Sequence, residues 1–306
     1  MKKQQISLTN ILLMFFLITF WGSSFVIVKA ILKEGLTPIA IATFRFLLAG
    51  LLFIIVLFLN RIRNPKNTLF VEKKDMPTII ILAFSGVTIF FIAQYTGIKM
   101  ANASIASILV CLLSPILISL LSLKIFKEKL SKTQLLGITT AAIGTTTVIL
   151  GGTPNLETNL TFLLGSLILL STPILWTTYT LIGKNIMKKY DPFLIVSYVN
   201  IIGGLFLIPF SLVENSLKTI LTLTNQEWLA ISYLAITCSV LGYFIWFHVM
   251  KHSSASATSS FLFAEPLVTV VFATILIKEE ITIFTISGGF LILTGLYLIT
   301  TKIIKN

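Results

Sequence analysis

The sequence contains few charged residues. Only 11% of its 306 residues are Asp, Glu, Lys or Arg, whereas 56% are hydrophobic. An ordinary soluble domain carries about 25% charged residues, so this composition excludes that class of protein. The apolar runs also leave no room for a sizeable soluble domain. The sequence therefore predicts an all-α membrane protein that lies in a lipid bilayer.

The common signatures of metal, nucleotide and nucleophile sites are also missing. The two cysteines, Cys111 and Cys238, stand inside apolar runs, with neither metal-ligand spacing nor the pattern of a disulfide framework. There is no G-x-x-x-x-G-K-S/T run for an ATP-driven pump, no H-E-x-x-H and no nucleophile elbow. We expect no metal, no cofactor and no enzymatic activity. The alternative, an intramembrane enzyme, would need paired catalytic groups at depth, and only Glu265 and Arg45 are available.

The basic residues indicate membrane topology. The net charge is +12, which could suggest nucleic acid as a partner, but Lys and Arg cluster between the apolar runs. Seventeen of them lie at one set of predicted helix ends and four at the opposite set. Because the more basic side faces the cytoplasm, we expect a multi-pass protein of the cell membrane with both termini cytoplasmic. The N-terminal apolar run lacks a small-residue cleavage site and is expected to remain as the first helix.

The hydropathy pattern predicts ten membrane helices, each close to the ~20 residues that span a bilayer. They cover roughly residues 9–31, 38–59, 77–97, 102–123, 133–151, 161–183, 192–213, 228–250, 254–276 and 283–301. Three prolines stand at helix starts, where a missing N–H costs little: Pro38, Pro77 and Pro192. Three are interior and predict breaks or kinks: Pro115, Pro173 and Pro266.

An internal repeat organises these helices. WGSSFVIVKAIL from Trp21 parallels WTTYTLIGKNIM from Trp176, and each carries a lysine at its ninth position, Lys29 and Lys184. Four residues of the first half recur with the same identity 151 positions later: Pro115, Glu128, Gly137 and Gly144. Each half holds five helices, and an odd number reverses the second half in the membrane. We therefore predict a 5+5 inverted-topology repeat, with residues 1–152 and 160–306 as its halves.

Glu265 is the main candidate for a transport site. It lies eleven residues past Ser254, or ~16 Å along a helix at ~1.5 Å per residue, and so near the middle of its span. A carboxylate there is expected to face a cavity or a partner, and Pro266 interrupts the helix beside it. If desolvation dominates, this side chain exchanges a proton near neutral pH, and protons are the coupling ion. If a nearby cation has the larger effect, the Glu265 carboxyl group stays ionised and binds an amine or fixes the site. The alternative is a purely structural role in packing.

Other candidates differ in depth and chemistry. Arg45 is expected ~10 Å into the membrane, at ~1.5 Å for each of the seven residues after Pro38. There it binds a substrate carboxylate or phosphate, or instead holds Glu265 or a backbone carbonyl. Lys29 is close enough to the surface to snorkel. His248 relays protons or reaches interfacial water. The remaining candidates line an apolar cavity or serve packing: Trp21, Tyr95, Ser114, Trp176, Tyr179 and Trp246.

The stretches WGSSFVIVK, ATFRFLLAG and ANASIASILVCLLSP, with the second-half run SSASATSSFLFAEPLVTVVFATILIKEE, resemble the drug/metabolite transporter superfamily, specifically the EamA-type ten-helix permeases. The resemblance covers nearly the whole chain. It implies a 5+5 inverted repeat, a central cavity and secondary transport of small metabolites, often export. One departure is visible, because VSYVN replaces ATFRF in the second half and leaves Arg45 without a basic counterpart.

The sequence thus predicts a secondary active transporter for a small amphipathic metabolite, such as an amino acid or related compound. The aromatic candidates suggest an amphipathic substrate, and only the resemblance suggests export. An alternative is an exchanger of organic anions or phosphorylated metabolites that uses Arg45 and Lys29. The substrate, the coupling ion and the oligomeric state stay open.

Overall fold

The computed structural model describes residues 7–63, 69–100, 109–128, 130–151, 160–277 and 283–304. Within these ranges every regular element is a helix, which confirms the all-α prediction. The first half contains α1 (Leu8–Lys33), α2 (Pro38–Arg63), η1 (Lys73–Asp75), α3 (Met76–Ala83), η2 (Phe84–Thr88), α4 (Ile89–Met100), η3 (Leu109–Leu113), α6 (Ser114–Ile125) and α7 (Lys132–Gly151). The second contains α8 (Leu160–Ile186), α9 (Pro192–Val213), η4 (Ser216–Leu221), α10 (Asn225–Tyr233), η5 (Leu234–Leu241), α11 (Gly242–His252), α12 (Ala255–Ser259), η6 (Ser260–Ala264), α13 (Glu265–Ile277) and α14 (Ile283–Ile304).

Seven helical stretches of the described chain are long and apolar enough to cross a membrane. They are Leu8–Lys33, Pro38–Arg63, Lys73–Met100, Leu163–Ile186, Pro192–Val213, Asn225–His252 and Ala255–Leu276. Two shorter apolar helices are Val110–Ile125 and Ile286–Ile299. Large apolar side chains cover the outer surface, with Leu167 63% and Phe290 72% exposed. A surface of this kind fits lipid, so the chain is a multi-pass membrane protein. The predicted count of ten spans stays a prediction.

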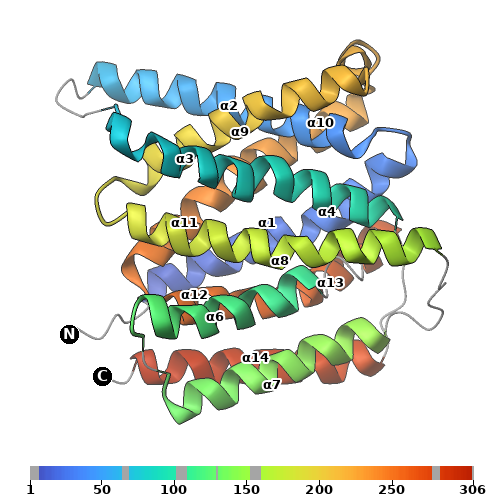
Figure 1. Ribbon diagram of the computed structural model, residues 1–306. Coiled ribbons are helices and arrows are strands. Elements are labelled where there is room, and N and C mark those ends of the chain that lie inside the picture. The colour runs from blue at the N-terminus through green and yellow to red at the C-terminus, as the bar shows by residue number, and fades with distance from the viewer. Residues whose placement is uncertain are drawn as a thin grey trace.

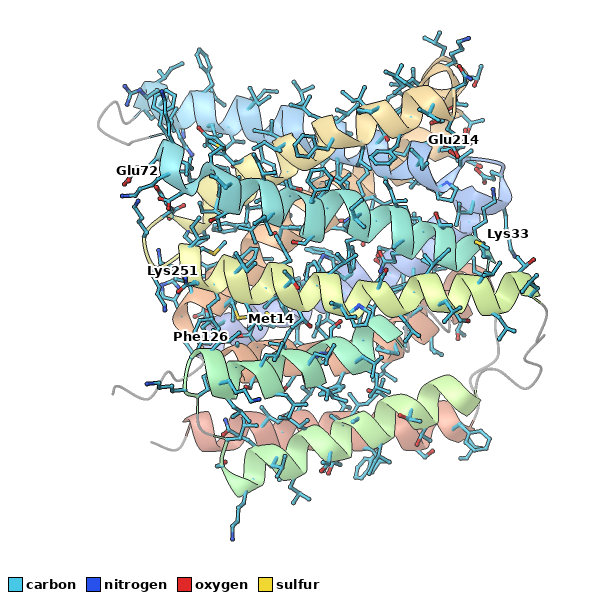
Figure 2. The ribbon with its side chains drawn as sticks, in the orientation of Figure 1. Met14, Lys33, Glu72, Phe126, Glu214 and Lys251 are labelled. Carbon is cyan, nitrogen blue, oxygen red and sulfur yellow. The ribbon has the colours of Figure 1, made fainter. Side chains whose placement is uncertain are left out.

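The helices run side by side across the molecule (Figure 1). α7 packs along α14 at one edge, and α2 packs along α9 near the other. α1, α4, α8, α11 and α13 lie between these pairs, with α1 against α13 and α4 against α8. The start of α1 and the end of α14 lie at the same face, which also carries Glu72, Phe126 and Lys251; we call it the terminal face (Figures 1 and 2). Lys33 and Glu214 lie at the opposite face.

The proline predictions hold at the helix starts. Pro38 and Pro192 begin α2 and α9, and Pro77 follows the first residue of α3. At Pro266 the expected interruption is present, because the α12 helix narrows to the 3-10 segment η6 before α13 begins at Glu265. At Pro173 the helix does not break, because α8 continues from Leu160 to Ile186 through this residue, and a kink there stays a prediction. A proline removes one backbone donor, and neighbouring helices in a membrane bundle tolerate that loss.

The described part of the chain contains three π-helical segments that the sequence pattern did not predict. η2 lies between α3 and α4, η3 precedes α6, and η5 lies between α10 and α11. A π-helical turn widens the helix and often occurs at functional sites. Residues from η3, and residues next to η2 and η5, line or support the cavity described next.

Candidate functional site

A cavity of about 40 Å³ lies in the interior of the bundle. Side chains from both halves of the chain surround it, including the two charged residues that the sequence singled out at depth. The lining residues are Trp21, Ser24, Phe25, Arg45, Phe90, Phe91, Gln94, Val110, Trp176, Tyr243, Leu262 and Glu265. The lining of this cavity is mostly aromatic, with one cation and one carboxyl group.

Arg45 is held by neutral partners. Its side chain is 2% exposed. The guanidinium Nε donates to Ser239 Oγ at 2.7 Å, and Nη1 donates to Tyr95 Oη at 2.6 Å. The guanidinium carbon lies 4.5 Å from the centre of the Phe91 ring. Hydrogen bonds and a cation–π contact offset part of the cost of burying the charge, yet within the described chain no carboxylate forms an ion pair with Arg45.

Glu265 sits at the junction of η6 and α13. Its side chain is 4% exposed, and the thiol of Cys111 in η3 is a hydrogen-bond partner of the carboxyl group. The narrow 3-10 turn before it and the proline after it fix its position on the cavity wall. Among the described residues no cation pairs with Glu265. The pairing of Arg45 with Glu265, one of the alternatives from the sequence, is thus not formed.

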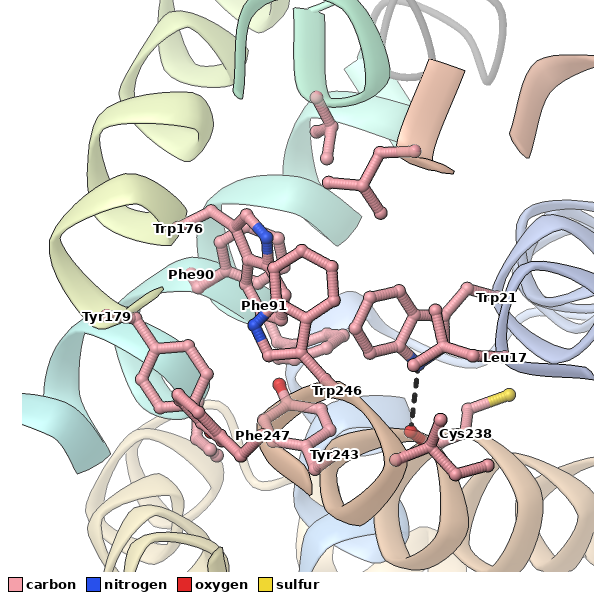
Figure 3. Close-up of a cluster of buried hydrophobic side chains, with 14 of the residues drawn as sticks. Leu17, Trp21, Phe90, Phe91, Trp176, Tyr179, Cys238, Tyr243, Trp246 and Phe247 are labelled. Atoms are coloured by element: carbon pink, nitrogen blue, oxygen red, sulfur yellow. Dashed lines mark hydrogen bonds between the residues drawn. The ribbon is translucent and has the colours of Figure 1, made fainter. Parts of the chain in front are cut away.

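Indole and phenol rings form the apolar wall (Figure 3). The Trp21 and Trp176 rings meet edge to face, with centroids 5.2 Å apart, and Tyr243 lies within 6.1 Å of each. Trp21 Nε1 donates to the backbone oxygen of Cys238 at 3.0 Å, the contact dashed in Figure 3. Tyr243 Oη donates to the backbone oxygen of Gly86 in η2 at 2.7 Å. These bonds orient the rings, so the wall is preformed.

Other polar atoms of this aromatic cluster have no partner. Within the described chain, Trp176 Nε1, Trp246 Nε1 and Tyr179 Oη are buried and make no hydrogen bond. A buried donor without an acceptor costs free energy. The cluster therefore holds unused hydrogen-bonding capacity next to the cavity.

The remaining predicted residues lie off the cavity wall. Tyr95 is buried behind Arg45 and acts on it through the bond above. Ser114, Tyr179 and Trp246 are buried but do not line the cavity, whereas Lys29 is only partly buried. His248 is also partly buried, at the end of α11, with its ring 4.9 Å from that of His252. The structure thus brings together Trp21, Arg45, Trp176 and Glu265, and places the others around or away from them.

A buried ion pair lies between the cavity and the terminal face. Lys184 Nζ is 3.2 Å from Glu128 Oε1, with the two side chains 7% and 11% exposed. Lys184 also donates to the backbone oxygen of Ser253 at 2.6 Å, and Glu128 accepts from the backbone N–H groups of Ala255 and Ser256. Burial opposes ionisation of Glu128, but Lys184 and these N–H groups outweigh it and lower the pKa of this carboxyl. We call the Glu128–Lys184 pair with Ser253 and Ser256 the latch.

The sequence pattern missed several residues of the site. Ser239 and Phe91 hold Arg45, yet one is an ordinary serine and the other one of 24 phenylalanines. The pairing of Glu128 with Lys184 joins positions 56 apart. Glu128 and Lys184 each have a counterpart in the internal repeat, and this marks both positions. The repeat does not indicate that the two side chains meet.

Comparisons with known proteins agree with the geometry. Two segments, residues 8–150 and 163–301, match the EamA-like transporter family. A protein of Archaeoglobus fulgidus described as an uncharacterized transporter is 30% identical over 283 residues, covering 92% of this chain and 94% of that protein. A probable amino-acid metabolite efflux pump of Salmonella typhimurium is 25% identical over 288 residues, covering 91% and 90%. A crystal structure with 16% identity superposes with a TM-score of 0.75 over 97% of this chain and 99% of that chain, which shows the fold. The chain belongs to the EamA-like transporter family.

Proposed function

We propose that this protein is a secondary transporter that exports a small zwitterionic and amphipathic metabolite, an amino acid or a close relative. Membership of a transporter family implies a small-molecule substrate and a bilayer. The probable amino-acid metabolite efflux pump among its relatives supports both the substrate class and the direction.

One observation carries the substrate class: Arg45 and Glu265 line the same cavity without pairing with each other. A buried charge without a counter-charge is costly. A zwitterion reduces that cost for both groups, with its carboxylate at Arg45 and its ammonium at Glu265. The rings of Trp21, Trp176 and Tyr243 then cover its apolar part.

The size of the cavity supports alternating access. A volume of about 40 Å³ has room for a few water molecules, whereas ligand pockets occupy roughly 300–1,000 Å³. Substrate therefore binds only after the surrounding helices move apart. Proton exchange at Glu265 would couple this motion to the proton gradient, since the carboxyl group loses its charge when it binds a proton.

The proposed architecture is ten helices in two inverted halves, residues 1–152 and 160–306. Both halves match the same family. The packing also supports it, because α7 contacts α14 and α2 contacts α9, which are the fifth and second predicted spans of each half. The contact of α1 with α13 has its counterpart in that of α8 with α6.

The terminal face is proposed to be cytoplasmic, in the cell membrane, because most Lys and Arg residues lie at that set of helix ends. A cysteine in place of Glu72 should then react with an impermeant thiol reagent only after the membrane is opened. A cysteine in place of Lys33, at the opposite face, should react in intact cells. The reverse pattern would invert the orientation.

The exchanger of organic or phosphorylated anions is less well supported. It needs a second cation beside Arg45, and Lys29 does not line the cavity. Glu265 would also repel an anionic substrate.

Transport in proteoliposomes tests the proposal. The purified chain should exchange a radiolabelled amino acid, and unlabelled zwitterions should compete. The N-acetyl and methyl-ester derivatives, which each remove one charge, should compete at least about tenfold less well, since one charge-assisted hydrogen bond is worth about 1.5–3 kcal/mol. The zwitterion proposal would be contradicted if either derivative competed as well as the parent amino acid. It would also be contradicted if the protein exchanged only phosphorylated compounds.

A further inference from the structure

Buried hydroxyl groups extend from the central cavity toward the terminal face, where α6 packs against both α8 and α12. At the cavity end, Trp176 of α8 and Leu262 of η6 line the wall. At the other end stands the latch, and Ser122 Oγ of α6 meets Ser256 Oγ of α12 at 2.8 Å. The interface between these helices therefore connects the site with the surface.

Several of these hydroxyl groups are unsatisfied. Within the described chain, the side-chain oxygens of five buried residues near this interface make no hydrogen bond: Ser114 and Ser119 of α6, Thr177 and Thr180 of α8, and Ser253 of the latch. Thr177, Thr180 and Lys184 are spaced by three and four residues, so they share one face of α8. Buried hydroxyl groups normally have a partner. Water or the polar groups of a substrate can supply the missing partner.

We propose that the interface between α6, α8 and α12 is the route by which a polar substrate moves between the cavity and the terminal face, and that the Glu128–Lys184 latch holds this route closed. The proposal rests on the transport function proposed above. When the helices separate, water reaches these hydroxyl groups. Their hydrogen bonds then replace part of the hydration shell of a zwitterion that passes along the route.

The chemistry of the latch suits a reversible closure. Glu128 joins the end of α6 to the start of α12, and Lys184 joins α8 to the same place through Ser253. When the latch parts, both charged groups are close enough to the helix ends to be solvated by water, whereas charges at mid-membrane would not be. The closed state therefore gains several charge-assisted hydrogen bonds, and the open state leaves no charge in lipid.

Thiol labelling of the full-length protein tests this route. A cysteine at Thr180 is labelled with a small cationic methanethiosulfonate, which reacts with a thiolate in water. Ile174→Cys is the matched control, because Ile174 is on the same helix and is 62% exposed on its outer surface. Chains without the introduced cysteine give the background from Cys111 and Cys238.

We expect Thr180→Cys to react slowly when the latch is intact and about tenfold faster when Glu128→Gln weakens it. Glu72→Gln is the control for loss of an acidic group, because Glu72 pairs with Lys189 at the exposed terminal face. It should leave the rate unchanged, and Ile174→Cys should not react in any of these backgrounds. Lys184→Gln breaks the same pair from the other side and serves if Glu128→Gln does not fold.

Two results would overturn the route: Thr180→Cys as inert as Ile174→Cys in both latch variants, or equally reactive with and without the latch. The labelling needs no substrate, so it is separable from the transport assay. Latch-dependent labelling without amino-acid flux would keep the route and reject the proposed substrate. Flux with latch-independent labelling would reject the route alone.

Discussion

Trp21 donates its indole N–H to the backbone carbonyl of Cys238 at 3.0 Å, so a side chain of the cavity wall also ties α1 to the π-helical segment η5. Trp176 faces the same cavity with its ring 5.2 Å away, but its N–H has no partner within the described chain. Two tryptophans at corresponding positions of the repeat therefore differ in what their nitrogen atoms do.

Replacing each tryptophan by phenylalanine separates these roles. Trp21→Phe leaves the Cys238 carbonyl buried without its donor, which should cost about 1–3 kcal/mol beyond the loss of ring volume. Trp176→Phe loses similar volume but no hydrogen bond, so its thermal unfolding midpoint in detergent should fall less. Equal losses in the two variants would show that the Trp21 bond contributes no net stability.

Tyr95 should act on substrate affinity through Arg45. Tyr95→Phe removes the hydroxyl that accepts from Arg45 Nη1 at 2.6 Å, so the guanidinium is less well positioned for a carboxylate. The apparent KM for a zwitterion should rise about tenfold, because a hydrogen bond to a charged group is worth about 1.5–3 kcal/mol. The control is Tyr179→Phe, whose buried hydroxyl has no partner in the described structure. A similar rise in that control would assign the effect to packing.

Glu265→Gln keeps the shape of the side chain and removes its charge. We expect this variant to fold and insert, and to lose most of its flux or the pH dependence of that flux. Uptake into proteoliposomes at several pH values measures both quantities. Full activity with an unchanged pH profile would show that Glu265 is a packing residue.

The latch should contribute to stability in a pH-dependent way. The pKa of the Glu128 carboxyl is lowered in the folded protein: burial raises it, but Lys184 and backbone donors outweigh that effect. Its contribution is therefore complete above the unfolded pKa of ~4.3 and is lost as the pH falls through the lower folded pKa. The stability gap between the parent and Glu128→Gln should stay constant from pH 7 to about 5 and shrink in more acidic buffer. A gap that is the same at every pH would exclude the charge of Glu128 as its cause.

The contact of α7 with α14 should not tolerate a side chain at Gly144. A Cβ there would lie 2.6 Å from the backbone oxygen of Gly288 and 2.8 Å from the backbone nitrogen of Ile292, and backbone atoms cannot move aside. Gly144→Ala should cost about 1–3 kcal/mol by overpacking. At Gly289 the nearest atom is the flexible end of Leu267, at 2.9 Å, so Gly289→Ala should be nearly neutral. Unfolding midpoints in detergent compare the two, and an unchanged midpoint for Gly144→Ala would contradict the close packing.

Hydropathy and proline positions were enough to predict the all-helical class and the starts of helices at Pro38, Pro77 and Pro192. Length and apolar composition limit where a span can lie, and a charge inside a span must face inward. For the same reason Glu265 and Arg45 reach the cavity wall. The outcome at Pro173 differs from that at Pro266, because the residues around a proline and the helices packed against it decide whether the helix narrows.

The partners of these residues could not be predicted. Whether Arg45 meets Glu265, or instead Ser239 and Tyr95, depends on the relative rotation and height of several helices. The spacing of apolar residues shows which face of a helix is buried, but it does not show which residues of a neighbouring helix that face meets. Lys29 and His248 illustrate the same limit, since each lies in a span yet near its end, where a long or amphipathic side chain reaches the surface rather than the cavity.

The eight residues of η5 determine how α11 is rotated about its axis. Each residue of an α-helix advances the chain by about 100°. If one residue were deleted between Leu234 and Leu241, the segment could close into an ordinary α-helix and turn everything after it by about that angle. The span would still be long and apolar enough for a bilayer, but Tyr243 and Trp246 would swing out of the aromatic cluster. The shape of the cavity wall thus depends on the number of residues in this segment as well as on their identity, and a relative one residue shorter here would present different side chains to the cavity.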